Sequence, residues 1–321
     1  MKTTKKITPG VIIPTQVDNV ILKVDGREVR LTNLRKLFCP DLGITKGALI
    51  QYYADVAPVL LPHVRDRAMV MRRYPNGAAG ASFFMKEAPS PRPSWIRICA
   101  IDHGDGKVVN FPVIDDRPSL LWLINLGCID LNQWYARCDD VYRPDFLHFD
   151  LDPGDGATFE QACEASLIVR DALTTLGMKP YVKTTGSRGL HVYVGLKRSP
   201  TQDAVHTFAK ALATELTSRN PKLMTVGYRV AARPKGRVVV DYKQNAWGQT
   251  LASIYSVRPK PLATVSTPVT WKEVEKGIRM EDFRIDNVRQ RVAKLGDLWK
   301  PLLTQKDRTN LVRFFARGHR V

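Results

Sequence analysis

Apolar and polar residues recur along this chain with the periods of both strands and helices. Residues 20–31 (VILKVDGREVRL) alternate around an Asp25-Gly26 pair, which predicts a β-hairpin. From residue 45 the apolar residues of ALIQYYADVAPVLLPHV have helical spacing until Pro62, so we expect a helix that ends there. Residues 67–74 predict a strand, and a glycine-rich loop, PNGAAGAS, follows it.

Strands and helices interleave most clearly in the middle of the chain. We expect a helix over 118–126, a strand over 146–151, a helix over 158–176, strands over 180–183 and 190–195, a helix over 202–219 and a strand over 237–241. From residue 146 the order is βαββαβ, which predicts an α+β (or α/β) sheet built from a split βαβ unit. We expect a boundary between an N-terminal subdomain and this sheet near residues 130–140, and polar helices after Pro268.

Composition narrows the class of protein. With 321 residues, of which 44% are hydrophobic and 25% charged, the chain can bury a substantial core. It has no run of roughly 20 apolar residues and no signal-peptide pattern at its start, so we expect a soluble cytoplasmic protein without a membrane. Five scattered cysteines without a CxxC pair argue against a disulfide framework or a zinc site.

The charge balance points to a polyanionic partner. There are 49 Lys and Arg against 31 Asp and Glu, a net charge of +18. Residues 206–260 contain ten Lys or Arg and two acids, and five more basic residues lie near the C-terminus: Lys306, Arg308, Arg313, Arg317 and Arg320. Nucleic acid explains this excess better than a membrane surface, because no strongly apolar amphipathic helix lies beside it. Ordinary solubility charge is the alternative.

Two acidic strand ends predict a metal site. In FLHFDLDP, Asp150 and Asp152 project from the same face of a strand, and Asp241 ends a second apolar strand, VVVD. Clustered carboxylates favour Mg²⁺ or Mn²⁺, and three of them could hold two ions that activate a hydroxyl and stabilise a leaving pyrophosphate. The acids could instead cap the following turn, and the DxD pattern also occurs in nucleotide-sugar transferases.

A glycine turn between the acidic strands predicts phosphate binding. The segment KTTGSRGLH (183–191) joins two strands through two glycines, hydroxyl side chains and Arg188. Exposed backbone N–H groups and these side chains could surround phosphate oxygens, although the spacing differs from a Walker A loop. His191 begins an alternating strand and would share a face with the acids; a structural histidine is the alternative.

Three motifs together resemble the polymerase domain of bacterial DNA ligase D, a member of the archaeo-eukaryotic primase superfamily. They are FDLDPG (149–154), TTGSRGLHVY (184–193) and VVVDYKQN (238–245), in family order within a likeness over 31–271. The resemblance implies a primase-polymerase core whose RRM-like split βαβ sheet packs on an N-terminal α/β subdomain. We expect this domain over 1–300 (subdomain 1–135, catalytic sheet 136–270, helical end 271–300), followed by a basic tail over 301–321 in a stand-alone version.

The resemblance also assigns roles to individual residues. The acids Asp150, Asp152 and Asp241 would be catalytic and bind two Mn²⁺ or Mg²⁺ ions. The nucleotide would be bound by Thr185, Ser187, Arg188, His191, Gln244 and Arg258. A 5′-phosphate on DNA would be bound by Asn33, Lys36 and Lys46. The template would contact Arg72, Arg73, Phe83, Phe84 and Lys86.

One segment departs from the family pattern. Where many members have a histidine in an ELHPW segment, this chain has IDLNQW (129–134). Asn132 can donate and accept hydrogen bonds, but it cannot act as an imidazole ligand or a titrating group. Asp130 or Asn132 would have to replace that histidine.

The leading hypothesis is templated nucleotidyl transfer onto a primer 3′-hydroxyl, for gap filling or end extension in repair of the non-homologous end joining type. The resemblance implies a preference for ribonucleotides and manganese. Expected partners are gapped or broken duplex DNA with a 5′-phosphate, NTPs or dNTPs, a separate DNA ligase and a Ku-type end-binding protein, with the chain a monomer at the bacterial nucleoid. Alternatives are an excision-repair polymerase, a de novo primase, a non-catalytic DNA-binding scaffold and, remotely, a glycosyltransferase.

Overall fold

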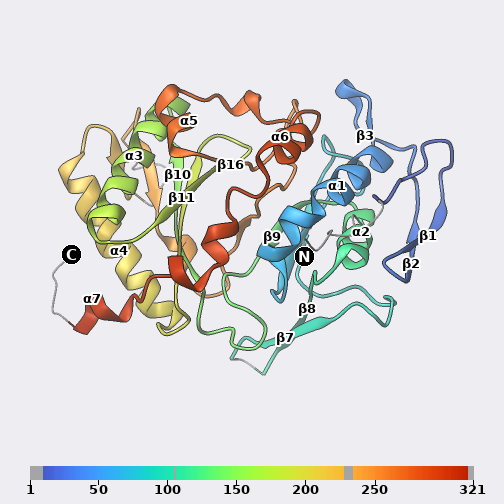
Figure 1. The fold of residues 1–321 in the computed structure, drawn as a ribbon, viewed down its shortest axis with the longest axis horizontal. Coiled ribbons are helices and arrows are strands. Elements are labelled where there is room, and N and C mark those ends of the chain that lie inside the picture. Colours follow the sequence, from blue (N-terminus) through green and yellow to red (C-terminus); the bar gives the residue numbers. More distant parts are fainter. Residues whose placement is uncertain (1–9, 105, 228–233, 317–321) are drawn as a thin grey trace, which may run out of the picture.

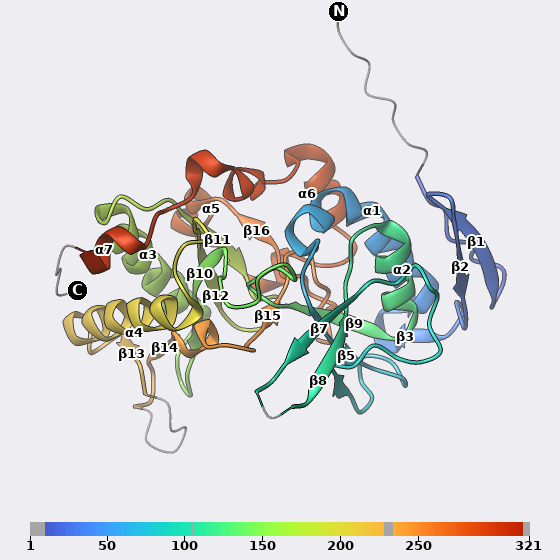
Figure 2. The same ribbon diagram turned by 90° about the horizontal axis from the view of Figure 1, so that it is seen from below.

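The computed structural model describes residues 10–104, 106–227 and 234–316, and two large sheets dominate them (Figure 1). One sheet has six strands and lies with helices α3 and α4; the other has four strands and lies toward α1 and α2 (Figures 1 and 2). The larger of two hydrophobic clusters contains side chains from both sheets, such as Ile129 and Leu147. The core therefore continues across the region where we expected a subdomain boundary.

The six-stranded sheet holds the acidic strands. Its strands, in spatial order, are β13 (Met224–Thr225), β14 (Val238–Asp241), β10 (Phe146–Pro153), β12 (Leu190–Gly195), β11 (Pro180–Thr184) and β16 (Pro268–Val269). Neighbouring strands are antiparallel except β13 and β14, which are parallel. Helices α3 (Phe159–Thr175) and α4 (Gln202–Arg219) connect them and pack on β10.

The expected βαββαβ order is confirmed. Along the chain the order is β10, α3, β11, β12, α4 and β14, with only the short β13 between the last two, and β14, β10, β12 and β11 lie in that spatial order. This is the arrangement of a split βαβ unit, in which β12 is inserted between β10 and β11. The fold class inferred from the sequence is thus confirmed, and β10 lies at the centre of the sheet.

The four-stranded sheet combines segments from distant parts of the chain. Its strands, in spatial order, are β15 (Leu251–Ala252), β9 (Cys128–Gln133), β5 (Met69–Arg73) and β6 (Phe83–Met85). Helix α2 (Arg117–Asn125) precedes β9 and packs against α1. Because β15 follows the third motif yet pairs with β9, the chain returns from one sheet to the edge of the other.

Three short hairpins complete the N-terminal part. They are β1 (Val20–Val24) with β2 (Arg27–Leu31), β3 (Leu37–Cys39) with β4 (Ile44–Thr45), and β7 (Ile98–Asp102) with β8 (Val108–Pro112). The first confirms the hairpin over 20–31. Asp25 and Gly26 both have positive φ, 46° and 85°, as a two-residue turn of this kind requires.

Helix α1 (Lys46–Val64) runs past the proline at which we expected it to end. Thr45 caps its start by accepting a hydrogen bond from the N–H of Ala48. An internal proline removes a backbone hydrogen bond at a cost of about 3 kcal/mol, and both Pro58 and Pro62 lie inside this helix. Burial of its apolar side chains offsets that cost. No helix in the described part of the chain is long and apolar enough to cross a membrane.

The C-terminal segment packs against the six-stranded sheet. It contains α5 (Trp271–Lys276), α6 (Val288–Leu295) and α7 (Val312–Ala316), with short 3₁₀ turns between them. The Trp299 indole donates a hydrogen bond to the Val182 carbonyl, and Thr309 exchanges backbone hydrogen bonds with Gly195 and Lys197. Of the tail expected from residue 301, the part to Thr309 is therefore attached to the six-stranded sheet, and α7 contacts α4 through Phe314 and Phe208. Arg317 and Arg320 lie outside the described residues.

Candidate active site

One row of polar side chains crosses the centre of the six-stranded sheet. Lys183 on β11 is paired with His191 on β12, His191 with Asp150 on β10, and Asp150 with Asp241 on β14. Directly paired residues on neighbouring strands project from the same face. The register thus brings two of the three predicted acids and His191 into a single line, with a lysine at its end.

Asp150 is the most constrained acid of the row. Its side chain is 16% exposed, and burial raises its pKa to about 6, against the opposing effect of Lys183, Arg258 and Arg188. The Oδ1 atom is buried and accepts no hydrogen bond in the structure, although His191 Nε2 lies 3.2 Å from it. A buried carboxylate oxygen without a donor is costly, so this position favours a cation or proton.

The two outer acids have local partners. Arg188 Nη2 lies 3.0 Å from Asp152 Oδ2. Asp241 accepts hydrogen bonds from the backbone N–H of Lys243 at 2.8 Å and from the Gln244 amide at 3.1 Å. Among the described residues, no group of three or more His, Cys, Asp or Glu side chains is arranged to hold a metal ion. The three acids lie on one face of the sheet, but their carboxylates do not converge on a single point.

The turn between β11 and β12 differs from our expectation. Thr185 Oγ1 accepts hydrogen bonds from the backbone N–H groups of Ser187, Arg188 and Gly189 at 3.0 to 3.1 Å. These three groups are directed into the turn, because a threonine hydroxyl is available inside it, and are not exposed for phosphate. The donors left at its surface are the side chains of Ser187 and Arg188, and Arg188 is 64% exposed.

Arg258 joins this turn to the four-stranded sheet. Its Nη1 donates to the Thr185 carbonyl at 3.0 Å, and its Nε lies 3.4 Å from Asp130 Oδ1. Asp130 is 1% exposed; burial raises its pKa, while Arg258 and Arg72 oppose that rise. Asn132, the residue at the family's histidine position, donates its amide to the Asp130 carbonyl at 3.0 Å.

These groups surround a cavity of about 250 Å³ between the two sheets. Nine predicted residues line it: Arg72, Phe84, Asp150, Asp152, Thr185, Ser187, Arg188, His191 and Arg258. Asp130 and Asn132 line it as well, together with the unpredicted residues Thr250, Leu251 and Ala252. Asp241 and Gln244 do not line the cavity. Asp241 lies beside it because it is paired with Asp150, and Gln244 donates a hydrogen bond to Asp241.

Lys183 is the clearest residue that sequence reasoning missed. It is 1% exposed, and its Nζ lies 2.7 Å from His191 Nδ1. The sequence contains one indication: Lys183 is the only charged residue of the expected strand PYVK, and it directly follows the apolar Val182. Its contact with His191 depends on strand register, which the local sequence does not specify.

Two exposed aromatic residues lie on β6, and one of them, Phe84, lines the cavity. Phe83 and Phe84 on β6 are 46% and 64% exposed, and their register partners on β5 are Arg73 and Arg72. The Arg73 guanidinium lies 5.5 Å from the centre of the Phe83 ring, and the Arg72 guanidinium lies 5.4 Å from the centre of the Phe84 ring. Lys86 is exposed just after this strand. Phe83 and Phe84 are therefore surface residues beside two arginines and do not belong to the core.

The predicted 5′-phosphate residues Asn33, Lys36 and Lys46 are linked by backbone hydrogen bonds near the start of α1, whereas the two ammonium groups donate to different carbonyls, Lys36 to Pro75 and Lys46 to Thr32. Lys46 donates its backbone N–H to the Lys36 carbonyl, and Lys36 donates its own to Asn33. Lys46 is 5% exposed; burial lowers its pKa to about 8, and the nearby charges of Lys36 and Arg73 add to that shift. Because the charge of Lys36 lowers the pKa of Lys46, an anion bound beside both side chains would stabilise the charged form of Lys46.

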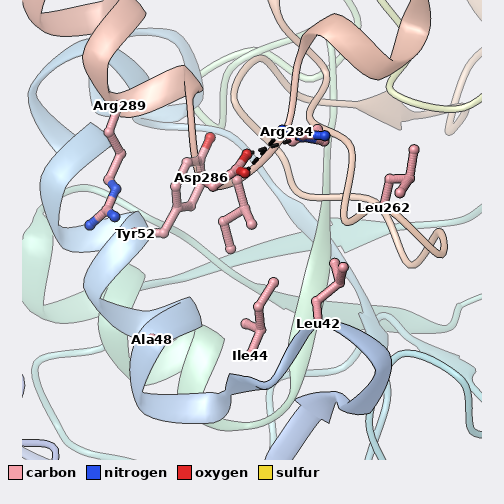
Figure 3. Close-up of a pocket in the computed structure, with 9 residues that line it drawn as sticks. Leu42, Ile44, Ala48, Tyr52, Leu262, Arg284, Asp286 and Arg289 are labelled. Atoms are coloured by element: carbon pink, nitrogen blue, oxygen red, sulfur yellow. Dashed lines mark hydrogen bonds and ion pairs between the residues drawn. The ribbon is translucent and has the colours of Figure 1, made fainter.

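A second cavity, of about 290 Å³, lies between the start of α1 and the segment before α6 (Figure 3). It contains none of the predicted residues. Its charged side chains pair within the protein, Arg284 with Asp286 at 3.2 Å and Arg289 with Asp55 at 3.0 Å. It therefore offers less chemistry than the cavity between the sheets.

Comparison with known proteins gives consistent similarities. The family model described as "LigD, primase-polymerase domain" matches residues 45–299. A multifunctional non-homologous end joining protein LigD from Mycolicibacterium smegmatis is 35% identical over 276 residues, which are 85% of this chain and 36% of that protein. A bifunctional LigD from Bacillus subtilis is 30% identical over 270 residues, 84% of this chain and 43% of that protein.

A solved structure is similar over nearly its whole length. The polymerase domain of Mycobacterium tuberculosis ligase D, in complex with DNA, matches with a TM-score of 0.81 and 31% identity, covering 86% of this chain and 98% of that one. The resemblance inferred from the three motifs is thereby confirmed. The chain spans about two fifths of the length of the curated relatives it matches, 36% and 43% for the two described above.

Proposed function

This chain belongs to the LigD primase-polymerase domain family, and on that premise we propose that it is a DNA-directed nucleotidyltransferase. It would add nucleotides, ribonucleotides preferentially, to a primer 3′-hydroxyl opposite a template. Short gaps and broken ends with a 5′-phosphate would be its substrates, as in non-homologous end joining. A ligase and a Ku-type end-binding protein would act on the same ends.

The observation that supports this most is the position of the acids beside the cavity of about 250 Å³ between the sheets. Asp150 and Asp152 line the cavity together with Ser187, Arg188 and Arg258. A nucleoside triphosphate needs cationic and hydroxyl donors for its phosphates and an acidic edge where the phosphoryl group reacts. Both kinds of group border this one space.

The residues present suit divalent cations. Asp150, Asp152 and Asp241 supply the carboxylate oxygens that Mg²⁺ and Mn²⁺ prefer, and Asp150 has a buried oxygen without a donor. Two ions bound by these acids would lower the pKa of the 3′-hydroxyl and stabilise the departing pyrophosphate. Asp152 and Asp241 would exchange their present contacts with Arg188 and Gln244 for the ions.

The other residues would bind and orient the substrates. Arg188, once released from Asp152, would join Ser187 on the triphosphate, with Arg258 neutralising charge from the side of Asp130. Thr185 would act through the turn, since its hydroxyl orders Ser187 and Arg188. Gln244 and His191 would complete the nucleotide site from β14 and β12.

The DNA would lie along the exposed side of β5 and β6. Phe83 and Phe84 present ring faces on which template bases stack. Arg72, Arg73 and Lys86 would contact the phosphates beside them. Asn33, Lys36 and Lys46 would hold the 5′-phosphate of the downstream strand, which carries more charge than an internal phosphate.

A gap-filling assay tests the proposal. A duplex with a short gap and a downstream 5′-phosphate is incubated with ribo- or deoxyribonucleoside triphosphates under Mn²⁺ or Mg²⁺. We expect templated extension, faster with ribonucleotides and Mn²⁺, and abolished in Asp150→Ala. Undiminished extension by Asp150→Ala would overturn the catalytic proposal, whereas salt-dependent DNA binding without extension would indicate a scaffold.

A further inference from the structure

Two cysteines that are far apart in the sequence meet in the smaller hydrophobic cluster. All five cysteines of the chain are free thiols in the structure. Cys99 is 4% exposed in this cluster, and the half-buried Cys138 packs against it. The two side chains are also hydrogen-bonded to each other. The other three, Cys39, Cys128 and Cys163, belong to the larger cluster or pack against it.

The backbone brings the two cysteines together. The N–H of Cys138 donates to the Asp66 carbonyl at 2.9 Å, and Arg97 Nη2 lies 2.6 Å from Asp66 Oδ1. Arg97 lies two residues before Cys99, and its carbonyl accepts from Val113, which extends the pairing of β7 with β8. Asp66 thus joins the segments that carry the two cysteines. Their proximity depends on these backbone contacts and on an ion pair as well as on the thiols.

The pair has the chemical features of redox-sensitive thiols. A thiolate, and not a thiol, attacks an oxidant. The hydrogen bond from Cys138 lowers the pKa of Cys99 against the effect of burial, and the charge of Arg97 adds to that shift. The same hydrogen bond and burial raise the pKa of Cys138. The pair therefore favours one thiolate beside one thiol, which is the state from which a disulfide forms.

We propose that Cys99 and Cys138 are a reversible modification site, at which a hydroperoxide such as hydrogen peroxide converts the two thiols into one intramolecular disulfide. The half-buried side chain of Cys138 leaves the pair accessible to a small oxidant. Redox-sensitive cysteines of other proteins commonly have a second cysteine beside them in this way. The site goes beyond the proposed nucleotidyl transfer and does not depend on it.

The oxidation takes place in two displacements. The ionised sulfur attacks one oxygen of the peroxide, so that an S–O bond forms, the O–O bond breaks, and the departing hydroxide takes up the proton that the thiol released. The second sulfur then attacks the first, so that the S–S bond forms, the S–O bond breaks and water leaves with the remaining thiol proton. Each sulfur loses one electron, and the peroxide is reduced to two molecules of water.

A disulfide at this position would close a long loop of the chain. Residues 99–138 contain β8, α2 and β9, which belong to the N-terminal part of the fold. Closing such a loop restricts the unfolded chain and so stabilises the folded state. Oxidation should therefore raise the melting temperature by about 5 °C, and reduction with dithiothreitol should reverse the rise.

The direct test is oxidation of the full-length protein with hydrogen peroxide, without metal or nucleotide, followed by alkylation of the remaining thiols in denaturant. We expect free thiols to fall from five to three, since one disulfide consumes two. Trypsin and a Glu-specific protease separate the two cysteines into peptides 98–107 and 138–160, and Cys163 lies in neither. Mass spectrometry should find these two peptides linked with the loss of two hydrogens, and dithiothreitol should separate them. Retention of all five thiols, loss of thiols without the linked peptides, or a link between any other pair would overturn the proposal.

Two serine substitutions distinguish this pair from general thiol oxidation. Cys138→Ser has four thiols, and we expect it to keep all four and to show no rise in melting temperature after the same treatment. Cys39→Ser, which removes another half-buried cysteine, is the matched control. It should fall from four thiols to two and still give the linked peptides. A rise in melting temperature of equal size in Cys138→Ser and the wild type would contradict the proposed link. Melting of each reduced variant reports its folding, and if Cys138→Ser does not fold, the linked peptides of the wild type still decide.

Discussion

Asp150 and Asp241 are directly paired across β10 and β14 in antiparallel register. Like charges in such positions repel each other, and one of them here is also buried. This pairing does not stabilise the fold unless a positive charge lies between the two acids. The pairing is therefore the structural fact most closely tied to the proposed reaction.

Asp150 should make folding stability depend on pH. Burial raises its pKa from 3.8 to about 6, so between these values the folded protein holds a proton that the unfolded chain has released. Stability is then lost as pH rises through this window. The substitution Asp150→Asn removes the titrating group. The free energy of unfolding of this variant should therefore rise on the order of 2 kcal/mol relative to that of the wild type between about pH 4 and pH 7.

Urea denaturation of both proteins in the presence of a chelator measures this difference. The free energies of unfolding should separate as pH rises and then stay apart above about pH 7. Curves that remain parallel across the whole range would contradict the raised pKa of Asp150.

Lys46 should make recognition of the 5′-phosphate sensitive to pH. Its pKa is lowered to about 8, so the ammonium is charged below that pH and is lost as pH rises through it. We expect the preference for a 5′-phosphate over a 5′-hydroxyl to weaken above about pH 8. Lys46→Met should reduce the preference about tenfold at neutral pH, as expected for one charged hydrogen bond.

Fluorescence anisotropy with gapped duplexes that differ in the 5′-phosphate gives this preference as a ratio of dissociation constants. Lys210→Met, from the exposed face of α4, is the matched control. A preference that survives both Lys46→Met and high pH would place the phosphate elsewhere.

Phe84 should contribute to DNA binding without contributing to stability. Its ring is 64% exposed, and stacking of a base on an aromatic side chain is worth about 1–3 kcal/mol. Phe84→Ala should weaken affinity for a templated duplex about tenfold or more, leave the melting temperature unchanged, and be rescued by Phe84→Trp. Tyr142→Ala removes an aromatic ring of similar exposure, 57%, and should have no such effect. Equal losses in both alanine variants would argue against a specific platform.

Gly189 should tolerate no side chain. A Cβ at this position would lie 1.9 Å from the Leu151 carbonyl oxygen, on the strand that holds Asp150 and Asp152. Gly189→Ala must displace β10 or the turn, and we expect destabilisation of about 1–3 kcal/mol together with a loss of extension. Gly10→Ala, where a Cβ meets nothing within 4 Å, is the control. Calorimetric melting of the two variants checks the difference.

The sequence predicted the local elements and the placement of Asp150 and Asp152 well. Alternation in FLHFDLDP placed Asp150 and Asp152 on one face, and the order of strands and helices predicted the split βαβ sheet. These inferences succeeded because periodicity and motif spacing are local properties. The exposure of Phe83 and Phe84 followed from the glycine loop before them, which leaves their short strand at a sheet edge.

Features that depend on contacts between distant segments were not predictable. The helix α1 passes Pro62 because tertiary burial outweighs a lost hydrogen bond. The N–H groups of the 185–189 turn point inward because Thr185 Oγ1 accepts them, a local choice that composition does not reveal. The contacts of buried Lys183 depend on the register of β11 and β12 and on Ser266, 83 residues away.

The attachment of residues 299–311 to β11 and β12 bears on how the protein can be shortened. The family match ends at Trp299, yet Leu302 and Leu311 are fully buried beyond it. A protein truncated after Trp299 would retain every predicted site residue. It would lose the apolar side chains that pack against the strands that bear Lys183 and His191. Inactivity of such a truncated protein would report a damaged scaffold, so expression should extend through at least Leu311.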